Sequence, residues 1–128
     1  MMEAVPQADV VITNPTHFAV ALRYDATRMQ APVVVAKGAD LVAGRIRQVA
    51  DKHEVTIVSA PPLARALYAS TELNQEVPAG LYLAVANILS YVYQLNALQT
   101  GDAITAEPTD LPIPDEWADV PREGQDEA

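Results

Sequence analysis

Cysteine is absent from this chain of 128 residues, and histidine occurs only twice, as His17 and His53. Disulfide bonds and thiolate zinc sites are therefore excluded, because both require cysteine sulfur. A metal site built from three histidines is excluded within one chain, because the chain has too few of them. We expect no metal and no cofactor, and we look for chemistry among the ordinary side chains.

Positive charge and long apolar runs are also scarce. Lys and Arg number 8 against 17 Asp and Glu, so the formal net charge is −9 and the isoelectric point is about 4.4. This balance argues against nucleic acid or an anionic membrane surface as the main partner. The longest apolar stretch, residues 81–95, is interrupted by Asn87 and Ser90 and is too short to span a membrane. We expect a soluble domain of a reducing compartment, or a soluble piece of a larger protein.

The apolar pattern predicts a small α/β fold. The β-branched run at 33–36 is typical of a central strand, and the last helix is apolar on most sides, so we expect it to be largely buried. Leu41, Val42, Ile46, Val49 and Ala50 are expected to share the buried face of the first helix. The result is a four-stranded mixed sheet surrounded by helices. Strands are expected at 8–13, 17–24, 33–36 and 55–58, and helices at 40–53, 63–70 and 79–98.

The amino-acid composition of the chain changes after residue 101. Residues 102–128 contain four prolines and many acidic side chains, and few residues that form a core. Such composition is typical of an extended or disordered tail. We therefore divide the chain into a domain over residues 1–101 and an acidic, proline-rich tail over residues 102–128.

Asn14 and Pro15 lie between two apolar runs, in a predicted loop over residues 14–17. Proline has no backbone N–H, so the usual attack of the following backbone nitrogen on the asparagine side chain cannot occur. The reverse attack remains possible. The side-chain nitrogen of Asn14 can attack its own carbonyl carbon, form a succinimide and expel Pro15 as a free amine. The residues thus permit a single cut of the chain by itself.

The other loop residues suit this chemistry. Pro15 restricts Asn14 to extended backbone angles, and a turn that aligns the attack is worth about 7–11 kcal/mol of barrier. Thr16 is expected to fix the turn by hydrogen bonds. His17 belongs to a residue type that titrates near neutral pH, and two roles stay open: a proton shuttle, or a side chain that only hydrogen-bonds the loop. Because Asn-Pro is a common turn dipeptide, a simple turn is the alternative interpretation.

Four sequence motifs, in a fixed order along the chain, resemble the motifs of a known protein family. They are ADVVITNPTHF at 8–18, APVVVAKG at 31–38, APPLARALY at 60–68, and a helix at 81–95 that opens with LY and ends with VYQL. They are similar to the cytoplasmic domain of the FlhB/YscU/SpaS family of type III secretion export-switch proteins, over about residues 1–117. The sequence LPIP at 111–114 favours the flagellar branch over the virulence-injectisome branch.

The resemblance implies a location, a function and partners. The chain would be the soluble domain, on the cytoplasmic side of the bacterial inner membrane, of a protein whose membrane helices this sequence does not include. Self-cleavage between Asn14 and Pro15 would take part in switching export from rod and hook proteins to filament proteins. The expected partners are other export-gate proteins, a hook-length control protein, and rod and hook export substrates.

A candidate substrate groove involves four small or apolar residues. Ala31 and Pro32 precede a predicted strand, and Ala86 and Leu89 lie one turn apart on the last helix. Such residues can leave a shallow groove for a short export-signal peptide, and the family's role in receiving early substrates motivates this interpretation. Ordinary core packing is the equal alternative.

Two further functional classes remain beside self-cleavage. A non-cleaving protein-binding module of a virulence-type secretion system would keep the Asn-Pro loop intact. An enzyme acting on other molecules would need an acid–base pair or a nucleophile beyond the loop, and the sequence offers none. Self-cleavage itself is a single intramolecular turnover, so we do not expect an enzyme.

Overall fold

The computed structural model describes residues 1–15, 17–97 and 107–118 of the chain. Thr16 and the tail residues 98–106 and 119–128 lie outside the described residues. The elements in chain order are the 3₁₀ helix η1 (Met2–Gln7), β1 (Val10–Asn14), β2 (Phe18–Arg23), β3 (Val33–Ala39), α1 (Asp40–Lys52), β4 (Ile57–Ser59), α2 (Pro61–Ser70), the 3₁₀ helix η2 (Ala79–Leu81), α3 (Tyr82–Ala97) and α4 (Asp115–Ala118).

The four strands form one mixed sheet in the order β3-β2-β1-β4, which confirms the predicted fold class. β1 pairs antiparallel with β2 and parallel with β4, and β2 pairs antiparallel with β3. The prediction of a central strand at 33–36 is wrong, because β3 lies at an edge of the sheet. Buried and half-buried positions alternate along β3, and Val34 joins the core under α2 and α3 whereas Ala36 joins the core under α1. β3 also continues through Gly38, where a side chain would collide with Val42.

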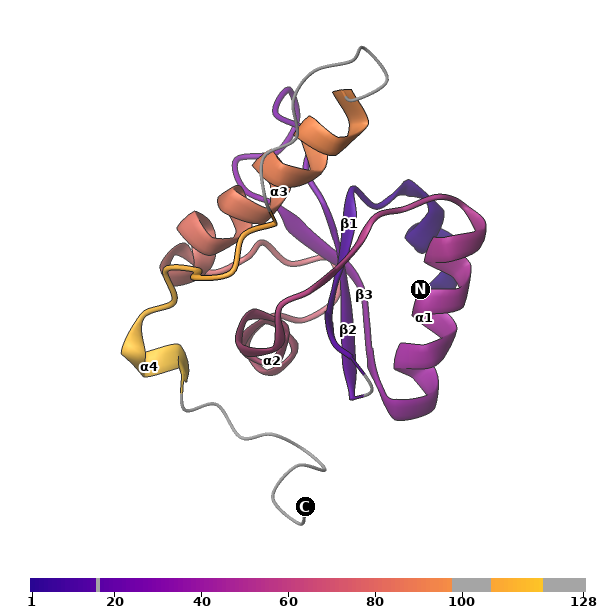
Figure 1. Ribbon diagram of the computed structural model, residues 1–128, viewed down its shortest axis with the longest axis horizontal. Coiled ribbons are helices and arrows are strands. Elements are labelled where there is room, and N and C mark those ends of the chain that lie inside the picture. Colours follow the sequence, from indigo (N-terminus) through magenta and orange to yellow (C-terminus); the bar gives the residue numbers. More distant parts are fainter. Residues whose placement is uncertain (16, 98–106, 119–128) are drawn as a thin grey trace.

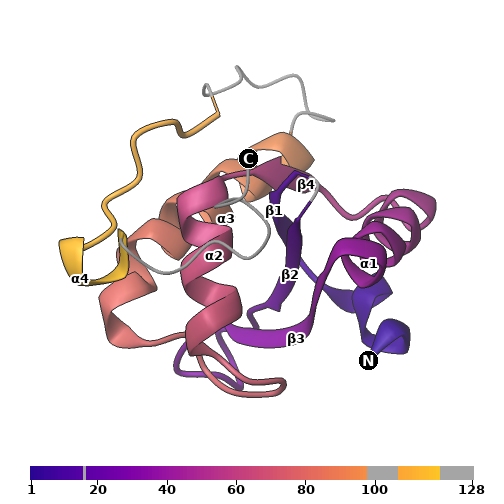
Figure 2. The ribbon, with the colours of Figure 1, turned by 90° about the horizontal axis from the view of Figure 1, so that it is seen from below.

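Helices cover both faces of the sheet (Figures 1 and 2). α1 and η1 lie on one side, and α2 and α3 on the other. Because side chains alternate along a strand, β1 and β2 contribute to two cores. Val10, Ile12, Val20 and Leu22 join the core under α2 and α3, while Val11, Ala19 and Ala21 join the core under α1. β1 is consequently buried along its whole length.

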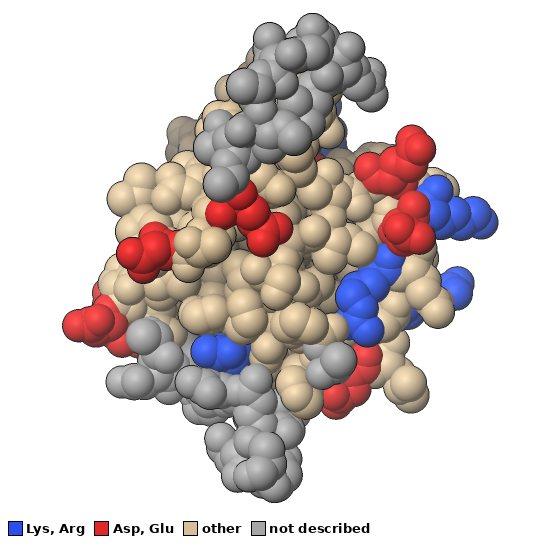
Figure 3. All heavy atoms as spheres, viewed as in Figure 1, with Lys and Arg blue, Asp and Glu red and all other residues tan. Residues whose placement is uncertain are grey.

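The predicted buried face of α1 is partly wrong. Ala43, Ile46 and Ala50 are the buried positions, whereas Leu41 is 92% exposed and Val42 is 42% exposed. The reason is geometric: Leu41 precedes Ala43 by two residues, which places it about 200° around the helix axis. Lys and Arg side chains gather on this side of the molecule, with Asp and Glu beside them (Figure 3).

The prediction that α3 is largely buried is also wrong. Five side chains on one stripe of the helix pack into the core, namely Ala84, Val85, Ile88, Leu89 and Val92. The opposite side faces solvent and mixes polar side chains, such as Asn87 and Gln94, with apolar ones, of which Leu83 is 62% exposed. α3 is an outer layer of the fold, so only one side meets the protein. Among the described residues, no helix has the length and hydropathy needed to cross a membrane.

The described part of the tail, residues 107–118, lies against the core. It runs without regular structure to Pro114 and then forms α4. Leu111, Ile113 and Trp117 are partly buried against the core under α2 and α3. Trp117 also contacts Gly80, where an added side chain would collide with the indole. The division of the chain after residue 101 stays a prediction.

Candidate functional site

The loop over residues 14–17 is a tight connection between β1 and β2. Asn14 and Phe18 are paired across the two strands, so only three residues lie between them. The backbone N–H of His17 donates to the carbonyl oxygen of Asn14 over 2.8 Å. Pro15 is exposed. The strands therefore hold both ends of the loop, and the carbonyl of the Asn14-Pro15 peptide bond accepts a hydrogen bond from within the turn.

Asn14 is buried with an unpaired amide nitrogen. Its side chain is only 4% exposed, and its Nδ2 atom has no hydrogen-bond partner among the described residues. An unpaired buried donor typically costs about 1–3 kcal/mol, so proteins rarely leave one in place without compensation. The same nitrogen is the atom that would attack the Asn14 carbonyl carbon. Within the described residues, no hydrogen bond competes for the nitrogen that such an attack would use.

His17 lies beside the first residue of α1. Its side chain is 31% exposed, but its Nδ1 atom is buried and lacks a hydrogen-bond partner among the described residues. The Asp40 carboxylate lies 3.8 Å from Nδ1, which is too long for a hydrogen bond. The backbone N–H of Asp40 donates to the His17 carbonyl over 2.9 Å. Asp40 has a φ of 50°, a conformation that few residues other than glycine adopt.

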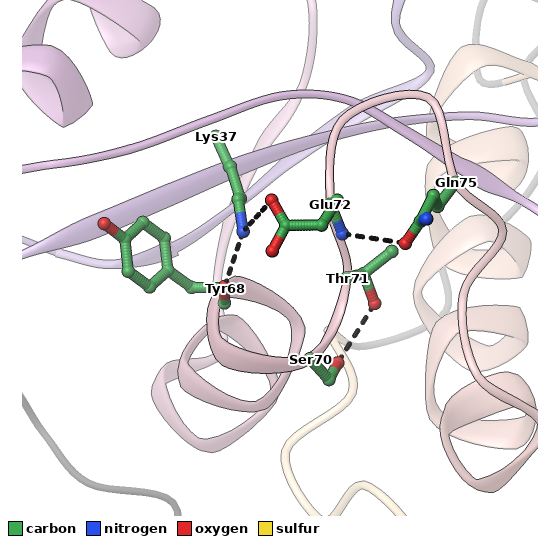
Figure 4. Close-up of polar contacts among 6 residues, drawn as sticks. All are labelled: Lys37, Tyr68, Ser70, Thr71, Glu72 and Gln75. Carbon is green, nitrogen blue, oxygen red and sulfur yellow. Dashed lines mark hydrogen bonds and ion pairs between the residues drawn. The ribbon is translucent and has the colours of Figure 1, made fainter.

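Aromatic stacking fixes the strand that follows the loop. The ring of Phe18 is buried and stacks on Tyr68 of α2, with ring centroids 4.5 Å apart and planes at 29°. Figure 4 shows Lys37 of β3 reaching toward the end of α2, where its Nζ donates to the Tyr68 carbonyl over 2.9 Å and lies 3.8 Å from the Glu72 carboxylate. The Lys37 Nζ also lies 5.1 Å from the centre of the Tyr68 ring. β3 and α2 together hold Phe18, and through it one end of the loop.

The four predicted groove residues surround one pocket. Ala31, Pro32, Ala86 and Leu89 line a cavity of about 200 Å³ together with Gln30 and two tyrosines, Tyr24 and Tyr82. Ala86 is exposed and Leu89 is 4% exposed, so the pocket opens on the solvent face of α3. Most of its lining is apolar. The pocket lies at the end of β2 opposite to the loop, and a strand of six residues spans about 20 Å.

A second, larger pocket involves the tail and was not indicated by the sequence. It has a volume of about 350 Å³ and lies between residues 59–62 and residues 107–113. Within the part of the chain that the structure describes, no three His, Asp or Glu side chains converge as metal ligands.

Sequence patterns did not indicate Asp40, Tyr68 or Lys37 as neighbours of the loop. Asp40 comes next to the loop through the pairing of β2 with β3, in which Phe18 lies opposite Ala39. Lys37 lies opposite Val20 and supports the loop only through its contact with Tyr68. Tyr68 reaches Phe18 from α2, about fifty residues further along the chain. The one sequence feature that could have indicated such a neighbour is the acidic residue Asp40, directly after the end of a strand.

Comparison with known proteins identifies the family. The profile of the FlhB HrpN YscU SpaS Family matches residues 1–92. Flagellar biosynthetic protein FlhB of Salmonella typhimurium is 52% identical over 116 residues, which cover 90% of this chain and 30% of that protein. The protein of the same name from Bacillus subtilis is 53% identical over 94 residues, covering 73% and 26%. The chain therefore spans less than a third of the length of these relatives.

Solved structures support the same family assignment. The cytoplasmic domain of FlhB from Shewanella putrefaciens superposes with a TM-score of 0.85 at 50% identity, over 91% of both chains. An EscU C-terminal domain with an Asn-to-Ala substitution superposes with a TM-score of 0.68 at 26% identity, over 70% of this chain and 89% of that one. Sequence, profile and structure converge, and this chain belongs to the FlhB/HrpN/YscU/SpaS family, where it corresponds to the cytoplasmic domain of the flagellar branch.

Proposed function

We propose that the chain cuts itself once between Asn14 and Pro15, and that this cut takes part in switching export from rod and hook proteins to filament proteins. The observation that carries the proposal is the buried Nδ2 of Asn14, which has no hydrogen-bond partner among the described residues and lies next to a peptide bond whose carbonyl accepts a hydrogen bond from the His17 backbone N–H. The nucleophile and the electrophile belong to the same residue, so no other molecule is required.

The chemical step balances within the loop. Asn14 Nδ2 forms a bond to the Asn14 carbonyl carbon, and the bond from that carbon to the Pro15 nitrogen breaks. The attacking amide loses one proton and the leaving nitrogen gains one. The products are a succinimide at the new C-terminus and a free secondary amine on Pro15, with no net gain or loss of protons.

Two features of His17 support this step. Its backbone N–H donates to the Asn14 carbonyl over 2.8 Å, so it stabilises the negative charge that develops on that oxygen during the attack. Its imidazole is the side chain that can carry the proton from the attacking nitrogen to the leaving nitrogen. The role expected of Thr16, hydrogen bonding within the loop, falls on a residue outside the described ones and stays a prediction. The reaction is a single turnover rather than catalysis on a substrate.

The fold keeps the two fragments together after the cut. β1 stays paired with both β2 and β4, and its side chains are buried in both cores. The N-terminal 3₁₀ helix adds the buried Val5 to the core under α1. We therefore expect the cut to change the shape of the loop and of the start of α1, while the sheet remains.

The solved EscU structures lend support. They include C-terminal domains with Asn-to-Ala, Asn-to-Asp and Pro-to-Ala substitutions, and the Asn and the Pro are consecutive in that chain. An Asn-Pro pair thus occurs in a relative of the same fold. For the whole protein we propose the partners that the family resemblance implies, namely other export-gate proteins, a hook-length control protein, and rod and hook export substrates.

The pocket at the other end of β2 supports a docking role. Its apolar lining from Ala31, Pro32, Ala86 and Leu89 suits one or two apolar side chains of a short peptide. We assign this pocket to the export signals of rod and hook substrates. Its small volume and its open position on α3 favour a transient contact, as export requires.

The decisive experiment is the intact mass of the purified chain, under denaturing conditions. We expect two fragments, residues 1–14 and 15–128, from the unmodified protein, and one full-length chain from Asn14→Ala. Asn87→Ala is the matched control, because Asn87 is exposed and has no proline after it. Fragments from Asn14→Ala would contradict the cyclisation. A full-length unmodified chain would favour a protein-binding module that keeps its Asn-Pro loop intact.

A further inference from the structure

Asp40 occupies a backbone position that favours glycine. It follows β3 directly and begins α1 with a φ of 50°, where asparagine and aspartate are the most tolerant residues after glycine. Its side chain is 76% exposed and points back toward the loop, with Oδ1 3.8 Å from His17 Nδ1. The backbone conformation explains a short polar residue here, but it does not require a negative charge.

Asp40 holds His17 in two ways. Its backbone N–H donates to the His17 carbonyl, which fixes the main chain of the loop. Its carboxylate is, within the described residues, the one acidic group within 4 Å of a His17 ring nitrogen. The nitrogen that it faces is Nδ1, which is buried and otherwise unpaired there. A carboxylate on this side of the ring favours a proton on Nδ1 and leaves Nε2 as the basic nitrogen.

We propose that Asp40 is a positioning residue for self-cleavage, which selects the His17 tautomer that carries its proton on Nδ1. This inference rests on the proposed self-cleavage and on the imidazole as its proton carrier. With Nδ1 protonated, Nε2 can accept the proton that leaves Asn14 and then deliver it to the Pro15 nitrogen. The gap of 3.8 Å shortens to a hydrogen bond as the ring gains positive charge, because catalytic hydrogen bonds often tighten only during the reaction.

Asp40→Asn is the variant that isolates the charge. Asparagine keeps the size of the side chain and tolerates the same φ, so the turn into α1 stays in place. Asp51→Asn is the matched control, since Asp51 is an exposed aspartate near the other end of α1. We expect Asp40→Asn to cleave about two- to fivefold more slowly, which is the size of effect of one largely exposed charge about 4 Å away. Asp51→Asn should cleave at the unmodified rate.

A spectroscopic measurement separates positioning from a structural role. In the uncleaved Asn14→Ala protein, imidazole ¹⁵N shifts report which ring nitrogen carries the proton, and His53 provides an internal reference. We expect His17 to be the Nδ1–H tautomer, and adding Asp40→Asn to shift it toward Nε2–H while His53 is unchanged.

The outcomes are distinguishable. An unchanged tautomer in Asp40→Asn overturns the inference, and so does a changed tautomer with an unchanged cleavage rate. An unmodified chain that stays full-length overturns the proposed function, and with it the positioning role of Asp40. Glycine at position 40 gives a second variant: Asp40→Gly fits the backbone, so cleavage at the unmodified rate in that variant would also overturn the inference.

Discussion

The two ends of β2 carry two different kinds of site. At one end, the loop over residues 14–17 consists of consecutive residues, two of which have buried nitrogen atoms without hydrogen-bond partners among the described residues. At the other end, the pocket is built from two segments, residues 24–32 and 82–89, and its lining is mostly apolar. The difference suits the two roles we propose, a reaction in the loop and peptide recognition in the pocket. The proposed reaction needs only neighbouring residues with unpaired polar atoms, whereas a docking pocket needs distant residues that the fold brings together.

The largest effect on cleavage is expected from His17→Ala, which tests whether the loop and the pocket act independently. Loss of the proton carrier should slow cleavage about 10²- to 10⁴-fold, as for other general acid–base groups, while peptide binding at the pocket stays unchanged. The measurement is the half-life of the full-length chain on a denaturing gel after rapid purification. His53→Ala, which changes the chain's other histidine, should cleave normally. Slowing of less than about threefold in His17→Ala would assign His17 only to hydrogen bonding within the loop.

The next effect concerns the support of the loop. Tyr68→Ala removes the ring that stacks on Phe18 and faces Lys37, so we expect the free energy of unfolding to fall by about 2–3 kcal/mol. Urea denaturation of the uncleaved Asn14→Ala protein measures this. Tyr68→Phe keeps the stack and should stay within about 0.5 kcal/mol. Equal stability of the Ala and Phe variants would show that the stack does not support this end of β2.

A smaller effect is expected at the pocket. Ala86→Lys places a charged chain among apolar side chains, and we expect it to weaken binding of a synthetic rod-protein N-terminal peptide about tenfold, or about 1.4 kcal/mol. Cleavage should be unaffected, because the loop lies at the far end of β2. Asn87→Lys adds the same charge to the next, exposed residue of α3 and should leave binding unchanged. Unchanged binding in Ala86→Lys, measured by calorimetry, would exclude the pocket as the docking site.

The sequence predicted the positions of the strands and helices better than their place in the sheet or the burial of their side chains. Apolar periodicity located all four strands and the helices α1, α2 and α3, but not η1 or α4. The proposed loop chemistry was inferred from Asn14 and Pro15 as neighbours in the chain. The edge position of β3 was missed because a β-branched run looks the same at the centre of a sheet and at its edge. The exposed side of α3 was missed because an apolar residue such as Leu83 is usually read as buried, and only packing decides which stripe meets the core.

Contacts between residues that are far apart in the chain could not be predicted from the sequence, for a similar reason. The four groove residues could be named because they form two short local patterns, although no pattern showed that one pocket joins them. Asp40 and Tyr68 contact the loop region through strand pairing and helix packing, and neither carries a periodic signal. Residues that support a site from another element are therefore the part that only a structure supplies.

The smallest predicted effect concerns the turn at the pocket end of β2, where polar groups are satisfied rather than left unpaired. The Thr27 hydroxyl and then the Thr27 backbone N–H donate to the Asp25 carboxylate, at 2.7 and 3.0 Å, and hold the pKa of Asp25 below its ordinary value. A pKa that is lowered in the folded state adds stability above the ordinary pKa of aspartate and loses it as the pH falls through the folded value. This carboxylate is exposed, so its contribution to stability is minor.

Thr27→Val should raise the pKa of Asp25 toward its ordinary value without fully restoring it, because the backbone N–H still donates. Thr27→Ser keeps the hydroxyl and should leave the pKa low. Carboxyl ¹³C shifts followed through a pH titration measure both variants. An unchanged pKa in Thr27→Val would mean that the hydroxyl does not satisfy Asp25. The contrast between the two ends of β2, paired polar groups beside the pocket and unpaired ones in the loop, would then lose its clearest example.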